Sequence, residues 1–188
     1  MSGEKLVYHC SPTTGIQVLE PSVTKYFGKP RQVCLTASLP MALFYGIRHF
    51  EYTYGYTREG VIYYMEYFPD ALEKLYRGKS ASLYRCVRRP DMEETAIPNE
   101  LVTALPVPVA EEIHVPDLWE ALLDQERSGA LRIIRWPEVN RENRDWILRA
   151  ERDTIVENGL LRGDTPFARY MQETYPESWA LAAREEQP

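Results

Sequence analysis

The chain has 188 residues, of which 44% are hydrophobic, 12% aromatic and 27% charged. This composition is typical of a globular protein and differs from the disordered, collagen-like and disulfide-rich classes. The formal net charge is −6, so the chain has no positive field to collect phosphate backbones or anionic lipid. Strong binding to duplex nucleic acid is therefore disfavoured.

The longest apolar runs span only a handful of residues, which predicts neither a membrane span nor a signal peptide. The three cysteines, Cys10, Cys34 and Cys86, are an odd number at spacings that fit neither a disulfide framework nor a zinc knuckle. We therefore expect a cytoplasmic protein with no membrane partner and no dedicated metal site.

Short apolar and β-branched runs bounded by Pro and Gly predict the strands. These strands cover residues 5–9, 32–37, 81–87, 101–105 and 107–114. The tyrosine-rich stretch 60–68 fits a strand and a helix equally well, so both assignments remain open. We expect the sheet to end at residue 114.

Helix starts are marked by residues whose side chains accept hydrogen bonds from backbone N–H groups of the first turn, or by Pro in that turn. The predicted helices are 38–49 after the N-cap Ser38, 70–77 between Pro69 and Gly78, 117–123 after Asp117, 140–158 after Asn140, 165–171 from Thr165-Pro166, and a last short turn from Pro176. This order predicts a mixed domain over residues 1–115 and a helical extension over residues 116–188 that packs on it.

The common catalytic signatures do not occur in the sequence. It contains no Gly-x-Gly-x-x-Gly, no Gly-x4-Gly-Lys-Ser/Thr, no Gly-x-Ser-x-Gly and no His-Glu-x-x-His. Rossmann, P-loop, lipase-like and zincin functions are therefore unsupported.

Three chemistry-bearing residues occur at ordered points of the predicted elements. His9 ends the first strand within Leu6-Val7-Tyr8-His9-Cys10-Ser11-Pro12, Tyr45 lies on the helix that follows the second strand, and Glu100 follows Pro98-Asn99. This order resembles the ADP-ribosyltransferase-like fold of the diphtheria toxin and poly(ADP-ribose) polymerase branch, in a small bacterial or phage form, over about residues 5–115.

The resemblance implies an α+β fold with a mixed, mostly antiparallel split sheet. It also implies NAD as substrate, transfer of ADP-ribose to a protein, nucleic acid or small-molecule acceptor, and release of nicotinamide. Glu100 and His9 are then the expected catalytic residues. The residues expected to contact NAD are His9, Ser11, Cys34, Ala37 and Tyr45.

Each residue type suits a part of this chemistry. Cleavage between nicotinamide and ribose passes through an oxocarbenium-like state, which a carboxylate such as Glu100 stabilises. A fixed imidazole at a strand end, as expected for His9, hydrogen-bonds a ribose hydroxyl. An aromatic face such as that of Tyr45 stacks on the nicotinamide ring.

Two positions depart from the family's pattern. Cys10 stands where the family has glycine after the histidine, and Cys34 stands where the His-Tyr-Glu set has its tyrosine. A thiol cannot stack on the ring, so a catalytically inactive nucleotide- or protein-binding module is a second hypothesis. An NAD glycohydrolase and a phosphotransferase relative also remain open.

Structural roles are the alternatives for the same residues. His9 fits a hydrogen-bonded strand end, Tyr45 fits a helix core, and Glu100 fits a solvated turn. Glu66 is a rival carboxylate among aromatic residues. The rivals of Tyr45 are Tyr52, Tyr54, Tyr56, Tyr63, Tyr64 and Tyr67. In a third hypothesis the C-terminal helices form a homo-oligomer interface through Trp119, Trp136, Trp146 and Trp179.

Overall fold

The computed structural model describes residues 5–22, 31–47 and 52–185. The chain divides into two compact units, the first comprising residues 1–50, 55–63 and 72–132 and the second residues 51–54, 64–71 and 133–188. The fold is α+β, as expected, with antiparallel strand pairing and six α-helices in the described ranges. No described helix is both long and apolar enough to cross a membrane.

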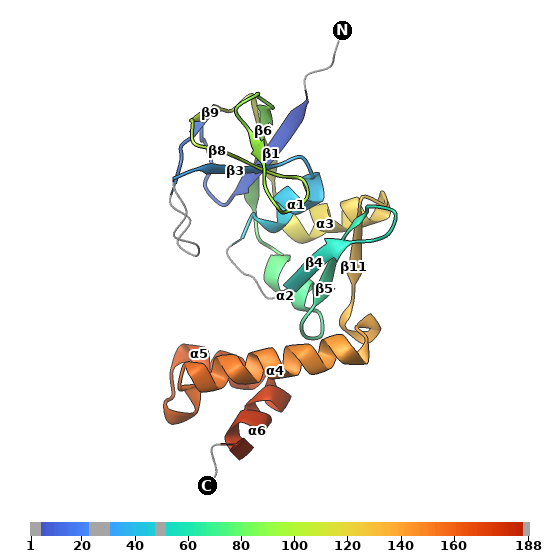
Figure 1. Ribbon diagram of the computed structural model, residues 1–188, viewed down its shortest axis with the longest axis vertical. Coiled ribbons are helices and arrows are strands. Elements are labelled where there is room, and N and C mark those ends of the chain that lie inside the picture. The colour runs from blue at the N-terminus through green and yellow to red at the C-terminus, as the bar shows by residue number, and fades with distance from the viewer. Residues whose placement is uncertain (1–4, 23–30, 48–51, 186–188) are drawn as a thin grey trace. The chain divides into compact units, whose positions relative to one another are not determined.

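A six-stranded sheet forms the centre of the first unit. Its strands are β1 (Leu6–Ser11), β3 (Val33–Thr36), β6 (Ala81–Val87), β7 (Glu93–Glu94), β8 (Glu100–Thr103) and β10 (Glu111–Val115). They lie in the order β10-β6-β1-β3-β8-β7, with β1, β3, β6 and β8 labelled in Figure 1. β1 pairs with β6 along its whole length and with β3 at Tyr8 and Thr36.

The two faces of this sheet have different covers, because successive side chains of a strand point to opposite sides. Val7, Leu35 and Leu101 are buried on one side together with Leu19 and Val107. The last two residues belong to a two-stranded sheet of β2 (Val18–Leu19) and β9 (Val107–Pro108). We call this side the strand-covered face.

The opposite side is covered by α1 (Leu39–Phe44) and α3 (Leu118–Arg127). Thr36 on β3 has its hydroxyl 3.3 Å from Met41 Sδ on α1. A Cβ added at Gly46, just after α1, would lie 3.0 Å from Cys10 Sγ on β1 and 2.9 Å from Leu118 Cδ1 on α3. We call this side the helix-covered face.

The expected N-cap of α1 is confirmed, but the helix is shorter than predicted. The Ser38 hydroxyl accepts a hydrogen bond from the Met41 N–H, and Pro40 lies in the first turn. The helix ends at Phe44 with Tyr45 as C-cap, because the Gly46 N–H turns back to the Leu43 carbonyl. The predicted residues 48 and 49 lie outside the described ranges.

Asp117 is confirmed as the N-cap of α3 and also holds a loop. Its Oδ1 accepts from the Trp119 and Glu120 N–H groups, while its Oδ2 accepts from the Gly78 N–H at 3.0 Å. Burial raises the pKa of this carboxyl, but these three backbone bonds outweigh burial and leave the pKa below its ordinary value. The first unit extends through this helix to residue 132, beyond the sequence-based boundary at 115.

The variant Asp117→Ala is expected to lose about 1 kcal/mol of the free energy of unfolding, because it removes the cap. Asp117→Asn should retain most of it, since asparagine also caps. Urea denaturation at several pH values measures both. The pKa of Asp117 is lowered in the folded protein. The difference in free energy of unfolding between wild type and Asp117→Ala should therefore be full above the ordinary carboxyl pKa, and it should disappear as the pH falls through the pKa of the folded protein. Equal stability of wild type and Asp117→Ala at pH 7 would contradict this role.

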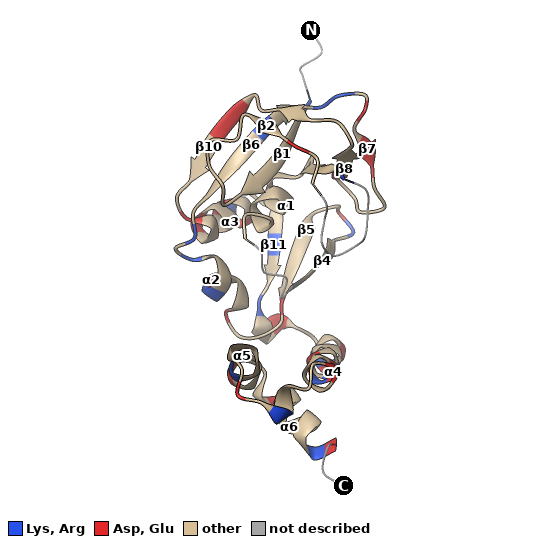
Figure 2. Cartoon of the chain, turned by 90° about the vertical axis from the view of Figure 1, so that its left-hand side faces the viewer, with Lys and Arg blue, Asp and Glu red and all other residues tan. Residues whose placement is uncertain are grey.

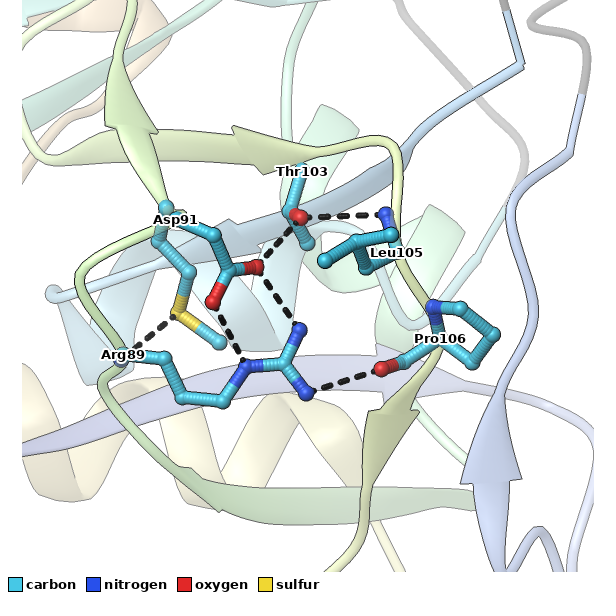
Figure 3. Close-up of polar contacts among 6 residues, drawn as sticks. Arg89, Asp91, Thr103, Leu105 and Pro106 are labelled. Carbon is cyan, nitrogen blue, oxygen red and sulfur yellow. Dashed lines mark hydrogen bonds and ion pairs between the residues drawn. The ribbon is translucent and has the colours of Figure 1, made fainter.

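The predicted strand 107–114 is two strands, β9 and β10, and the predicted 101–105 strand is shortened to β8. The Ala110 N–H donates to the Arg85 carbonyl, so the chain switches to pairing with β6 at this point. A polar group shown in Figure 3 joins the turn between β6 and β7 to the turn that follows β8. In this group the Arg89 guanidinium bonds both oxygens of Asp91 and the Pro106 carbonyl, and the Thr103 hydroxyl donates to Asp91 at 2.7 Å.

A second sheet contains β4 (Tyr52–Tyr56), β5 (Ile62–Glu66) and β11 (Leu131–Ile134), in the order β11-β5-β4. β5 resolves the stretch 60–68 in favour of a strand. β11 shows that the expected end of the sheet structure at residue 114 was wrong. The missed strand has four residues, and its pairing with β5 is distant in sequence, so no local pattern reports it.

The second unit is mainly helical. Its helices are α4 (Arg141–Glu157), α5 (Pro166–Thr174) and α6 (Pro176–Glu185), with single 3-10 turns at Trp136–Glu138 and Leu160–Arg162, while α2 (Ala71–Tyr76) begins at the boundary of the units. The N-caps Asn140 and Thr165 are confirmed. Pro176 starts a ten-residue helix rather than a short turn. Ile147, Ile155 and Met171 are buried in the core of this unit.

Candidate functional site

His9 lies on the central strand β1 and is fixed by its neighbour β3. Its Nδ1 is 3.1 Å from the carbonyl oxygen of Cys34. A carbonyl only accepts, so Nδ1–H donates, and in the neutral ring Nε2 is then an acceptor. Burial lowers the pKa of His9, and the bond to the Cys34 carbonyl opposes this only partly. The imidazole is therefore neutral at pH 7.

This environment predicts a pH dependence of stability. The pKa of His9 in the folded protein is below its ordinary value of 6.5, so the unfolded chain binds the proton at higher pH than the folded one. The contribution of His9 to the free energy of unfolding is thus full above pH 6.5 and decreases as the pH falls toward the folded pKa. His9→Gln should remove this slope in urea titrations between pH 7 and pH 5. His114→Gln, which removes an exposed imidazole, should keep it, and equal slopes in all three proteins would contradict the prediction.

Glu100 opens β8 beside the end of β3. The Ala37 N–H donates to the Asn99 carbonyl at 2.8 Å, and Glu100 is the register partner of Thr36. The Glu100 carboxylate accepts a 2.6 Å hydrogen bond from the Thr95 hydroxyl. Glu100 is half-buried. The carboxylate is thus held where β3 ends and the chain turns into α1.

Strand register decides which of the expected residues share a face. Tyr8, Thr36 and Glu100 are successive register partners across β1, β3 and β8, so their side chains point to the helix-covered face. Cys34 points the same way. His9 and Ser11 point to the strand-covered face. The Cα atoms of Tyr8 and Glu100 are two strand spacings apart, about 10 Å.

Tyr45 lies on the same side as Glu100, at the C-terminal end of α1. Its side chain is 37% exposed, so it is not the core residue of the structural alternative. Ala37 is exposed between β3 and α1. The structure therefore places the six expected residues on β1, β3, β8, the β3–α1 connection and the C-terminal end of α1, but divides them between the two faces.

The strand-covered face carries polar residues that sequence analysis missed. The register partners of His9 and Ser11 on β6 are Tyr84 and Ser82, and Glu112 is the next partner of Tyr84 on β10. Acidic residues mark β10 in Figure 2. The Glu112 carboxylate accepts from the Ser82 hydroxyl at 2.6 Å, from the Gly15 N–H at 3.0 Å and from the Tyr84 hydroxyl at 3.2 Å.

The hydrogen bonds from Ser82 and Gly15 hold the pKa of Glu112 below its ordinary value despite the opposing effect of burial. The Tyr84 hydroxyl also lies 2.7 Å from the Thr13 carbonyl. Glu112 and Tyr84 thus tie the loop after β1 to the sheet. The sequence does show polar residues at alternate positions of these strands, at 82 and 84 and at 112 and 114. Only the pairing of β6 with β1 and β10 shows that they lie on the same face as His9.

The rival carboxylate Glu66 and the thiol of Cys10, the neighbour of His9 in sequence, are both buried. Glu66 is buried in the second unit and accepts a 2.9 Å hydrogen bond from the Trp136 N–H. Cys10 points to the face opposite to His9, and burial raises the pKa of its thiol to about 12, so it is a poor nucleophile at pH 7.

A pocket of about 200 Å³ contains none of the expected residues. It is lined by Val87, Arg89, Val107, Pro108, Val109 and Ala110. No group of three or more His, Cys, Asp or Glu side chains within residues 5–22, 31–47 and 52–185 is placed to hold a metal ion.

Comparison with known proteins gives no relative. No protein-family model, no curated protein and no solved structure matches this chain.

Proposed function

We propose that the first unit binds NAD and transfers its ADP-ribose to an acceptor with release of nicotinamide. In this reaction the bond between the ribose C1′ and the nicotinamide nitrogen breaks, and its electron pair leaves with nicotinamide. The acceptor nucleophile bonds to C1′ and loses its proton to Glu100. The carboxylate of Glu100 also stabilises the positive charge that develops on the ribose.

One observation carries this proposal: Glu100 lies where β3 ends and α1 begins, because the Ala37 N–H bonds the Asn99 carbonyl. The same connection leads to the exposed Tyr45 at the end of α1. A carboxylate and an aromatic ring on one side of the sheet suit a ribose and its attached nicotinamide. The Thr95 hydroxyl, 2.6 Å from Glu100, orients the carboxylate before substrate arrives.

His9 has a different part in the proposal. Its ring lies on the strand-covered face, so we assign bond cleavage to Glu100 and not to His9. The hydrogen bond from His9 to the Cys34 carbonyl fixes β3, the strand that ends beside Glu100.

Incubation of the full chain with NAD labelled in the nicotinamide ring tests the proposal. We expect release of labelled nicotinamide, and transfer of label to protein, RNA or small-molecule acceptors when the label is in the adenosine instead. Hydrolysis without transfer would indicate an NAD glycohydrolase. Neither binding nor turnover of NAD by the folded protein would refute the proposal.

A non-catalytic nucleotide-binding module is the second candidate, and a specific observation favours it. The register separates His9 from Glu100 by the thickness of the sheet, and Cys34 replaces the tyrosine of the His-Tyr-Glu set. Calorimetry distinguishes the two functions, since the module would bind NAD and leave it intact.

A further inference from the structure

The turn before Glu100 has a strained backbone that needs support. Asn99 has a φ of +66°, in the left-handed region that residues other than glycine rarely adopt. Asn99 directly precedes Glu100, so its conformation sets the direction in which β8 leaves the turn. Strain of this kind persists where the surrounding structure holds it, and it concentrates at functional sites.

The side chain of Tyr56 forms hydrogen bonds to this turn. Tyr56 is the last residue of β4 and belongs to the first unit. Its hydroxyl donates to the Pro98 carbonyl at 2.8 Å and accepts from the Asn99 side-chain amide, Nδ2, at 3.1 Å. The phenol therefore bonds both residues that precede Glu100. Tyr56 is 42 residues from Pro98 in sequence, so these contacts are tertiary and not part of the turn itself.

The other backbone hydrogen bonds of the turn lie within residues 95–100 and do not connect it to the rest of the sheet. The Glu100 N–H donates to the Ile97 carbonyl at 3.1 Å, and the Thr95 N–H donates to the Glu100 carbonyl at 3.2 Å. These bonds close the 95–100 segment on itself. The bonds from Ala37 and Tyr56 connect Pro98 and Asn99 to the end of β3 and to β4.

We propose that Tyr56 is a positioning residue, whose hydroxyl holds Asn99 in the left-handed conformation and thereby aims the Glu100 carboxylate at the ribose. The proposal rests on the proposed function for its catalytic part. Small displacements of a catalytic group lower the rate of the chemical step more than they lower binding. Tyr56 acts through Glu100, so its loss should reduce kcat and leave KM for NAD almost unchanged.

The test is Tyr56→Phe, which keeps the ring and removes both hydrogen bonds. We expect kcat for nicotinamide release to fall about tenfold with little change in KM. Tyr63→Phe is the matched control on the neighbouring strand β5. The Tyr63 ring and hydroxyl lie over Gly55, and successive residues of a strand face opposite sides, so this is the side of β4 opposite to the Tyr56 side chain. Adding Asn99→Gly to Tyr56→Phe should restore part of the rate, since glycine adopts a positive φ without support.

A second measurement does not depend on activity. The Ala37 N–H bonds the Asn99 carbonyl, so its hydrogen exchange reports whether the turn is held. Exchange at Ala37 should be about tenfold faster in Tyr56→Phe than in Tyr63→Phe, with exchange of the β6 amides unchanged.

The outcomes separate this inference from the proposed function. Faster exchange together with a lower kcat supports the positioning role. Unchanged exchange, or faster exchange with an unchanged kcat, overturns it. If the wild-type protein does not turn over NAD while exchange at Ala37 responds to Tyr56→Phe, the proposed function fails and the hold of Tyr56 on the turn is established.

Discussion

Glu100→Gln is expected to lower the rate of nicotinamide release from NAD by a factor of about 10²–10³, the usual effect of removing one electrostatic group that stabilises a transition state. Glutamine has nearly the same shape and its side-chain oxygen can still accept from the Thr95 hydroxyl. The substitution therefore removes charge without disturbing the turn. KM for NAD should change much less than kcat, because the charge is needed where the ribose becomes positive.

Glu93→Gln is the matched control for this substitution. Glu93 lies on β7, pairs in register with Val102 and so points to the same face as Glu100. Its side chain is exposed, and it should release nicotinamide at the wild-type rate. A Glu100→Gln protein as active as Glu93→Gln would remove Glu100 from the reaction and leave NAD binding without turnover as the remaining function on this site.

Gly46→Ala is expected to destabilise the protein by about 1–3 kcal/mol, the range found for overpacking. The added Cβ would lie 2.9 Å from Leu118 Cδ1, 3.0 Å from Cys10 Sγ and 3.0 Å from the Leu43 carbonyl oxygen. Leu118 and Cys10 are buried, and the carbonyl belongs to the backbone of α1, so the neighbours cannot all move away. The free energy of unfolding in urea measures the effect.

Gly163→Ala controls for the general effect of replacing glycine. At Gly163 the nearest atom to an added Cβ is 3.9 Å away, and φ is −151°, which any residue adopts. This variant should remain within about 0.5 kcal/mol of the wild type, as for most surface changes. If Gly46→Ala were equally stable, the contact between the end of α1 and α3 would be looser than the structure indicates.

Helix starts were predictable from the sequence because a cap is a local interaction. Ser38, Asp117, Asn140 and Thr165 each bond backbone N–H groups two or three residues further on. The strand β6 was also predicted with its observed limits. In these cases the residues that define the element are neighbours in sequence.

The errors concern contacts between distant residues. β11 and the two-residue strand β2 are too short to give a period, and they exist because partners far along the chain pair with them. β7 also has only two residues, but its partner β8 is the next strand along the chain. The division of 107–114 into β9 and β10 has the same origin, since β9 pairs with β2 and β10 pairs with β6. Pairing of this kind depends on which edges meet in the folded chain.

For the candidate site, the order of residues along the chain was enough to propose His9, Tyr45 and Glu100. It placed His9 at the end of a strand and Glu100 just before one, whereas β8 begins at Glu100 itself. The alternation of side chains along a strand follows from backbone geometry and needs no partner. Which face each residue reaches is a property of the register between strands, and this was set by packing of β1, β3 and β8 with α1 and α3. That packing put Glu100 with Thr36, put His9 with Tyr84, and brought Tyr56 to the turn at Asn99.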